Sequence, residues 1–144
     1  MDLQFDDVVK SGFCWGEYPA RIDDTGRLRL PKAIVDLLAE HGISRLWRCP
    51  DPRVKRFVLS PPDHRATFIN AVMGRCSDSE DSERAWRLIC SGTDAAIDSQ
   101  GRITIPKACL EHAEIEPPQQ VVVLGVGFSY EVRASARMAG RNCA

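Results

Sequence analysis

The chain has 144 residues, of which 44% are hydrophobic and 27% are charged, and its formal net charge is −1. These values are typical of a globular domain, and they exclude a polycationic protein that would be drawn to nucleic acid by its overall charge. No apolar run approaches the roughly 20 residues of a membrane-spanning helix, and the acidic N-terminus lacks the apolar segment of a secretory signal. We therefore expect a cytoplasmic protein with no membrane partner.

Six cysteines are spread along the chain without a Cys-x-x-Cys pair and without a histidine at zinc-ligand spacing. This distribution opposes a structural metal site, and we expect neither a metal nor another cofactor. In a reducing compartment the thiols would remain free, and most of them would fill space in the core.

Residues 20–33 (ARIDDTGRLRLPKA) predict a strand, a tight turn, a second strand and the start of a helix. The side chains of Asp23 and Asp24 can accept hydrogen bonds from turn N–H groups, and Gly26 permits positive φ. The next four residues alternate polar and apolar, as in a half-buried strand, and Pro31 suits the first position of a helix. We call residues 23–26 the first turn.

Residues 20–60 carry nine Lys or Arg against five Asp or Glu. This local excess permits an anion-binding surface, although a solvated surface of mixed charge is the alternative. Two strands are expected at 46–49 and 56–59. The basic cluster on this hairpin is interpreted either as a further group of phosphate contacts or, preferably, as a solvated edge strand. Its members are Arg53, Lys55 and Arg56.

Two helices are expected next, forming a hairpin that connects two similar halves of the chain. Ser60-Pro61-Pro62-Asp63 resembles a helix start, and the acidic run 77–83 is expected to open the second helix. The apolar residues expected to be buried on that second helix are Ala85, Trp86, Leu88 and Ile89.

Residues 95–108 (AAIDSQGRITIPKA) repeat the first segment 75 positions later, with eight of fourteen residues identical and no gap. Such similarity in a short chain indicates an internal duplication. We call residues 98–101 the second turn, in which Asp98 and Gly101 correspond to Asp23 and Gly26. Strands at 121–124 and 128–133 complete the second half.

Each half is too small to bury its own sheet, so the two should pack together as one pseudo-two-fold barrel with interlocked hairpins. The predicted fold is a β-barrel core with flanking helices. The predicted domains are a first repeat at 13–62, a helical connector at 63–90 and a second repeat at 91–136. Both turns are expected at the same end of the molecule.

The pattern Asp-x-x-Gly-Arg-x-x-x-Pro, in a hairpin followed by a helix, resembles the signature of AbrB-type swapped-hairpin domains. Two copies in one chain, with Gly16-Glu17-Tyr18 before the first and Val121–Gly125 after the second, resemble the MraZ family. The resemblance implies two AbrB-like βαβ halves in one swapped-hairpin barrel. It also implies a bacterial, nucleoid-associated transcriptional regulator that forms homo-oligomeric rings. Such a regulator would bind repeated boxes in double-stranded DNA and repress its own division and cell-wall operon.

Arg27 is the first candidate for DNA contact, because an arginine after a tight turn can reach a phosphate or the edge of a guanine. The alternative is that Arg27 pairs with an aspartate and locks the turn. Its counterpart Arg102 is a second candidate. Arg21, Arg29 and Lys32 would contact the DNA backbone, and Thr25 in the first turn is the remaining DNA-binding candidate. The residues expected to hold the two turns are Asp23, Gly26, Asp98 and Gly101.

Two other functions remain as alternatives. Thr25 stands where the family pattern has a lysine, and residues 33–35 lack its arginine, so an oligomeric scaffold or protein-binding ring without DNA contact is the first. Asp24-Thr25-Gly26 is also the signature of aspartic proteases, which makes an aspartyl hydrolase the remote alternative. The second repeat has Ser99-Gln100-Gly101 at this place and lacks the second aspartate, so we expect no enzyme.

Overall fold

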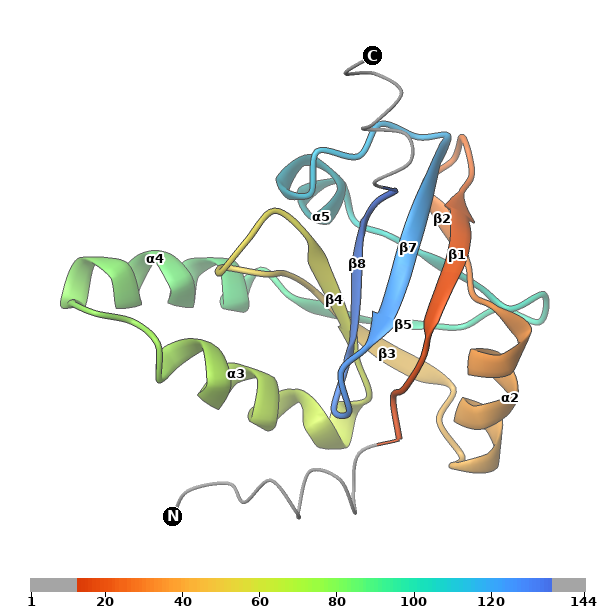
Figure 1. The fold of residues 1–144 in the computed structure, drawn as a ribbon, viewed down its shortest axis with the longest axis horizontal. Coiled ribbons are helices and arrows are strands. Elements are labelled where there is room, and N and C mark those ends of the chain that lie inside the picture. Colours follow the sequence, from red (N-terminus) through yellow and green to blue (C-terminus); the bar gives the residue numbers. More distant parts are fainter. Residues whose placement is uncertain (1–12, 136–144) are drawn as a thin grey trace.

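A computed structural model describes residues 13–135 as one antiparallel eight-stranded sheet that curls into a nearly closed barrel (Figure 1). The strand order is β5-β3-β4-β8-β7-β1-β2-β6. The strands are β1 (Glu17–Ile22), β2 (Arg27–Arg29), β3 (Arg45–Pro50), β4 (Phe57–Ser60), β5 (Thr93–Ala96), β6 (Arg102–Thr104), β7 (Gln119–Gly125) and β8 (Tyr130–Ala134). The predicted β-barrel core is confirmed.

The flanking helices are α2 (Lys32–Glu40), α3 (Arg65–Met73), α4 (Ser79–Cys90) and α5 (Lys107–His112), with a short 3₁₀ helix η1 (Pro62–His64) before α3. None of the helices within residues 13–135 has the length and apolar character that crossing a bilayer requires. The division into repeats at 13–62 and 91–136 with a connector at 63–90 stays a prediction, and residue 136 lies outside the described part of the chain.

The two halves are interlocked about a pseudo-two-fold axis. β1 pairs with β7 of the second half, and β5 pairs with β3 of the first half. Arg21 lies opposite Gln120, and Arg45 lies opposite Ala96. Ala96 is the counterpart of Arg21 in the second repeat, and Gln120 is the counterpart of Arg45, so the two pairs are equivalent by the pseudo-two-fold symmetry. Between β2 and β6, Leu28 faces its own counterpart Ile103, so the axis passes between these two side chains.

Alternation along the strands separates a barrel interior from an outer face. The side chains of Ile22, Leu28 and Ile103 are all at most 1% exposed and meet in the interior. A second apolar layer lies between the outer face of β3 and β4 and the helix pair α3–α4. The buried residues of this layer are Trp47, Cys49, Val58, Phe68, Val72, Ala85 and Ile89. The two helices therefore cover one side of the barrel.

Trp86 was expected to be buried but is 49% exposed, so this prediction is wrong. The buried positions of α4 are Ala85 and Ile89, which are four residues apart and share one helix face. Since successive residues on a helix differ by about 100°, the side chain after Ala85 is turned away from that face.

The basic cluster after β3 is not part of a solvated edge strand, because β4 lies between β3 and β8. The carboxylate of Asp51 is fully buried and accepts hydrogen bonds from Nε of Arg53 at 2.9 Å and from Nε of Arg56 at 2.7 Å. Arg56 also pairs with Glu131 of β8 at 3.1 Å. Lys55 makes an exposed pair with Glu114. These charges tie the β3–β4 loop to its neighbours.

The second hairpin differs from the first. β1 and β2 are hydrogen-bonded neighbours, whereas β5 and β6 form the two edges of the sheet. The guanidinium of Arg48, a side chain inside the barrel, donates to carbonyl oxygens of Thr93 in β5 and Thr104 in β6. Its counterpart in the second half is the fully buried Val123. Arg48 thus connects the two edge strands, β5 and β6, which are not paired with each other.

Candidate nucleic-acid interface

The first turn is built around the carboxylate of Asp23. Its Oδ1 accepts hydrogen bonds from the backbone N–H of Thr25 and of Arg27, both at 3.0 Å, and from the hydroxyl of Thr25 at 2.7 Å. The backbone N–H of Arg27 and the Thr25 hydroxyl lower the pKa of Asp23, because these donors stabilise the ionised form. Gly26 has φ = 82°, in the region that favours glycine.

The second turn repeats this arrangement. Oδ1 of Asp98 accepts from the backbone N–H of Gln100 and of Arg102, both at 2.9 Å, and Gly101 has φ = 77°. The backbone N–H of Arg102 is the main cause that lowers the pKa of Asp98. The aspartate and glycine of each turn therefore occupy the positions that turn chemistry predicts.

Arg27 is paired within its own turn. Its Nε donates to Oδ2 of Asp23 at 3.1 Å and to the hydroxyl of Thr25 at 2.9 Å, and 36% of its side chain is exposed. This is the turn-locking arrangement that the sequence offered as the alternative to DNA contact. Among the described residues only this nitrogen of the guanidinium has a partner, so the two terminal nitrogens remain available to a ligand.

Three other arginines form a row across neighbouring strands. Arg21 of β1 lies directly opposite Arg29 of β2, which lies directly opposite Arg102 of β6. Residues opposite one another in antiparallel strands project from the same face, and strands are about 4.8 Å apart, so the outer two are separated by roughly 10 Å. We call Arg21, Arg29 and Arg102 the arginine row.

The arginine row lies on an open surface. Arg21 and Arg29 are exposed and Arg102 is partly buried. Nη1 of Arg29 donates to the backbone carbonyl of Gln100 at 3.1 Å, and Nε of Arg102 pairs with Asp98 at 3.0 Å. Helices α3 and α4 lie over the other side of the barrel (Figure 1). The row was not recognisable from the sequence, because its members meet only through strand pairing.

Lys32 is not a member of the row and lies at the start of α2. Its ammonium pairs with Asp36 one helical turn later at 2.8 Å, and both side chains are largely exposed. The hydrogen bond from this ammonium to Asp36 is the main cause that raises the pKa of Lys32. An exposed pair of this kind holds its lysine weakly, so Lys32 can exchange its partner.

The two turns lie at opposite ends of the β2–β6 ribbon, so the expectation that they share one end is wrong. The backbone N–H of Leu30 donates to Gly101 in the second turn, while that of Ile105 donates to Gly26 in the first, both at 2.9 Å. Antiparallel pairing causes this separation, because each strand starts where the other ends. Asp24 and its counterpart Ser99 are therefore not neighbours and form no carboxylate pair.

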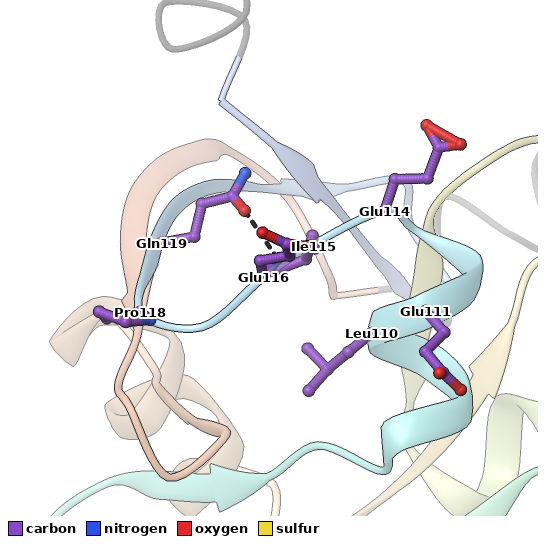
Figure 2. Close-up of a pocket in the computed structure, with 7 residues that line it drawn as sticks. All are labelled: Leu110, Glu111, Glu114, Ile115, Glu116, Pro118 and Gln119. Atoms are coloured by element: carbon purple, nitrogen blue, oxygen red, sulfur yellow. Dashed lines mark hydrogen bonds between the residues drawn. The ribbon is translucent and has the colours of Figure 1, made fainter.

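A hollow of about 630 Å³ lies where α5 leads into β7 (Figure 2). It is next to the first turn, because a Cβ added at Gly26 would lie 3.7 Å from Leu110, which lines the hollow. Its lining includes three carboxylates, Glu111, Glu114 and Glu116. The backbone N–H of Glu116 donates to the side-chain oxygen of Gln119 at 2.9 Å. No group of three His, Cys, Asp or Glu side chains within residues 13–135 could hold a metal ion. Glu114 is paired with Lys55, so Glu111 and Glu116 give this end of the ribbon its acidic character.

Comparison with known proteins identifies relatives over most of the chain. The chain is 32% identical to the transcriptional regulator MraZ of Roseiflexus sp. (strain RS-1) over 123 residues, which cover 85% of this chain and 81% of the relative. It is 31% identical to the protein of the same name from Roseiflexus castenholzii, with the same coverage, and 31% identical to that from Alkaliphilus oremlandii over 81% of this chain and 78% of the relative. No protein-family model matches the chain. The identities and coverage, together with the interlocked barrel and its duplicated turns, show that the chain belongs to the MraZ family.

Proposed function

We propose that this protein is a sequence-specific DNA-binding transcriptional regulator. The observation that carries the proposal is the open sheet face with its arginine row, Arg21, Arg29 and Arg102. Guanidinium groups bind phosphate oxygens through paired donors, and contacts to the DNA backbone supply a large share of the affinity of such proteins. The relatives are named transcriptional regulators, not enzymes, which agrees with this assignment.

The resemblance to MraZ extends the proposal to assembly and target. The protein would form a homo-oligomeric ring, associate with the nucleoid and repress its own division and cell-wall operon. Trp15, before β1, and Trp86, on α4, are each 49% exposed. A contact that joins different surfaces of two copies generates a ring when the rotation closes, and two exposed tryptophans on different elements suit such a contact.

The test is a fluorescence-anisotropy titration of duplex DNA from upstream of this gene, against a scrambled duplex of the same length and composition. Tighter binding to the upstream DNA, weakening steeply with salt, is expected from a contact made largely through phosphates. Light scattering on the same samples measures the oligomeric state. An intact oligomer that binds both duplexes equally would contradict sequence-specific regulation, and one that binds neither would favour a protein-binding ring.

A further inference from the structure

We infer that Thr25 is a positioning residue whose hydroxyl orients the Arg27 guanidinium for contact with DNA. The inference rests on the proposed DNA-binding function and assigns a role to a further side chain of the first turn. It follows from a contact that the first turn makes and that its counterpart in the second turn lacks.

The hydroxyl of Thr25 lies between the two charged side chains of the first turn. It donates to Oδ1 of Asp23 at 2.7 Å and accepts from Nε of Arg27 at 2.9 Å. Because a hydroxyl has both a proton to donate and lone pairs to accept with, the two contacts form together and fix its direction. Thr25 is exposed, so its side chain contributes these contacts to the turn and does not pack in the core.

The Arg27 guanidinium is held through its Nε only. This nitrogen donates to Oδ2 of Asp23 at 3.1 Å as well as to the Thr25 hydroxyl. The two terminal nitrogens have no partner among residues 13–135, and they are the donors that a phosphate or a base edge would accept from. An arginine normally loses side-chain entropy when it binds. A guanidinium that is already fixed in the free protein loses less, which favours the complex.

Arg27 lies on the same surface as the arginine row. It is two residues from Arg29 on β2, so both side chains project from one face of the sheet, with their Cα atoms about 7 Å apart. Arg29 in turn lies opposite Arg21 and Arg102 on the neighbouring strands. One duplex can therefore contact the first turn and the row together.

The second turn lacks the hydroxyl. Gln100 stands at the place of Thr25 in the alignment of the two repeats. The backbone N–H of Gln100 donates to Asp98, but its side chain makes no hydrogen bond to any residue that the structure describes. Nε of Arg102 is held by Asp98 alone, at 3.0 Å, and 21% of its side chain is exposed against 36% for Arg27. Two turns with the same backbone thus differ in how the arginine is held.

Removing the hydroxyl without changing the size of the side chain tests the inference. Thr25→Val keeps the branched shape and abolishes both hydrogen bonds, whereas Thr25→Ser keeps the hydroxyl. DNA affinity is measured by anisotropy on upstream and scrambled duplexes, for each variant alone and combined with Arg27→Ala. Gln100→Val is the matched control, because it places the same side chain at the equivalent exposed position of the second turn. Thermal melting verifies that the variants fold.

Thr25→Val is expected to weaken binding about 3- to 10-fold, the range for the loss of one hydrogen bond. Thr25→Ser and Gln100→Val are expected to stay within about twofold of the wild type, as surface substitutions do. Combined with Arg27→Ala, Thr25→Val is expected to have no further effect, because no guanidinium is left to orient. Such coupling between two variants is a readout that a role in folding alone would not produce.

Three results would overturn the inference. The first is unchanged binding by Thr25→Val or by Arg27→Ala. The second is a Thr25→Val effect of the same size with and without Arg27, which would mean that the hydroxyl contacts DNA itself. The third is a failure of Thr25→Ser to retain affinity.

Two further outcomes separate the inference from the proposed function. Equal affinity for upstream and scrambled DNA, with the coupling between Thr25 and Arg27 intact, would contradict sequence-specific regulation and support the positioning role. Absence of binding to either duplex by the wild type would overturn both.

Discussion

Replacing Asp51 should be among the most damaging single changes outside the apolar core. Its carboxylate is completely buried at the start of the β3–β4 loop and accepts four hydrogen bonds, three from Arg53 and one from Arg56. Burial alone would raise the pKa of Asp51, but the hydrogen bonds from Arg53 and Arg56 outweigh it and hold the pKa below its usual range. The folded protein therefore depends on the ionised carboxylate.

The expected loss follows from breaking a buried ion pair on one side. Such changes cost about 3–5 kcal/mol, because the remaining charges lose their partner in a site that water enters poorly. Arg53 and Arg56 are 21% and 22% exposed and keep Glu131 nearby, so part of the loss is recovered by hydration. We expect Asp51→Ala to lower the free energy of unfolding by about 3 kcal/mol, a large share of a typical domain's stability.

Urea denaturation followed by circular dichroism measures this change. Lys55→Ala is the matched control, since it removes a loop charge whose pair with Glu114 is 73% and 63% exposed, and such pairs contribute less than about 1 kcal/mol. A loss for Asp51→Ala no greater than that of the control would refute the argument, and would mean that the arginines hold the loop through other contacts.

Three further outcomes are expected. Leu28→Ala, at the pseudo-two-fold axis, should lower the free energy of unfolding by about 2–5 kcal/mol in the same urea assay, and a loss below about 1 kcal/mol would contradict its central place in the core. The backbone N–H of Arg102 lowers the pKa of Asp98, so the ionised Asp98 side chain stabilises the fold above pH ~4 and this stabilisation is lost as the pH falls below that value. Between pH 7 and pH 3 the melting temperature of Asp98→Asn should therefore fall less than that of the wild type. Burial raises the pKa of Cys14 to about 12, whereas Cys90 is exposed, so maleimide labelling at pH 7 read by peptide mass spectrometry should modify Cys90 well before Cys14; equal rates would contradict the buried position.

Local chemistry was predictable because its causes lie within a few residues of one another. An aspartate three residues before a glycine, followed by an arginine, specifies which N–H groups the carboxylate caps, and both turns have this structure. Alternation in residues 27–30 likewise places Leu28 inside. The repeat itself indicated that two halves share one barrel, since neither could bury its sheet alone.

The buried face of a helix was less predictable, because the apolar character of a residue does not show whether another element packs over it. Ala85 and Trp86 are adjacent in sequence, yet only Ala85 reaches the layer beneath α4. Similarly, the loop arginines Arg53 and Arg56 looked like free surface charge, because one of the carboxylates that neutralise them, Glu131, lies on β8 in the other half of the chain.

The turns, the alternation of the strands and the duplicated barrel are therefore readable from the amino-acid sequence, because they depend on contacts between near neighbours or on the periodicity of apolar residues. Which arginines lie next to one another is set by the packing of strands that are distant in the chain. Arg29 and Arg102 belong to different halves of the chain and meet because β2 and β6 pair in one register, and the same antiparallel pairing sends the two turns to opposite ends. Strand register is a property of two segments at once, so no single stretch of this chain contains it.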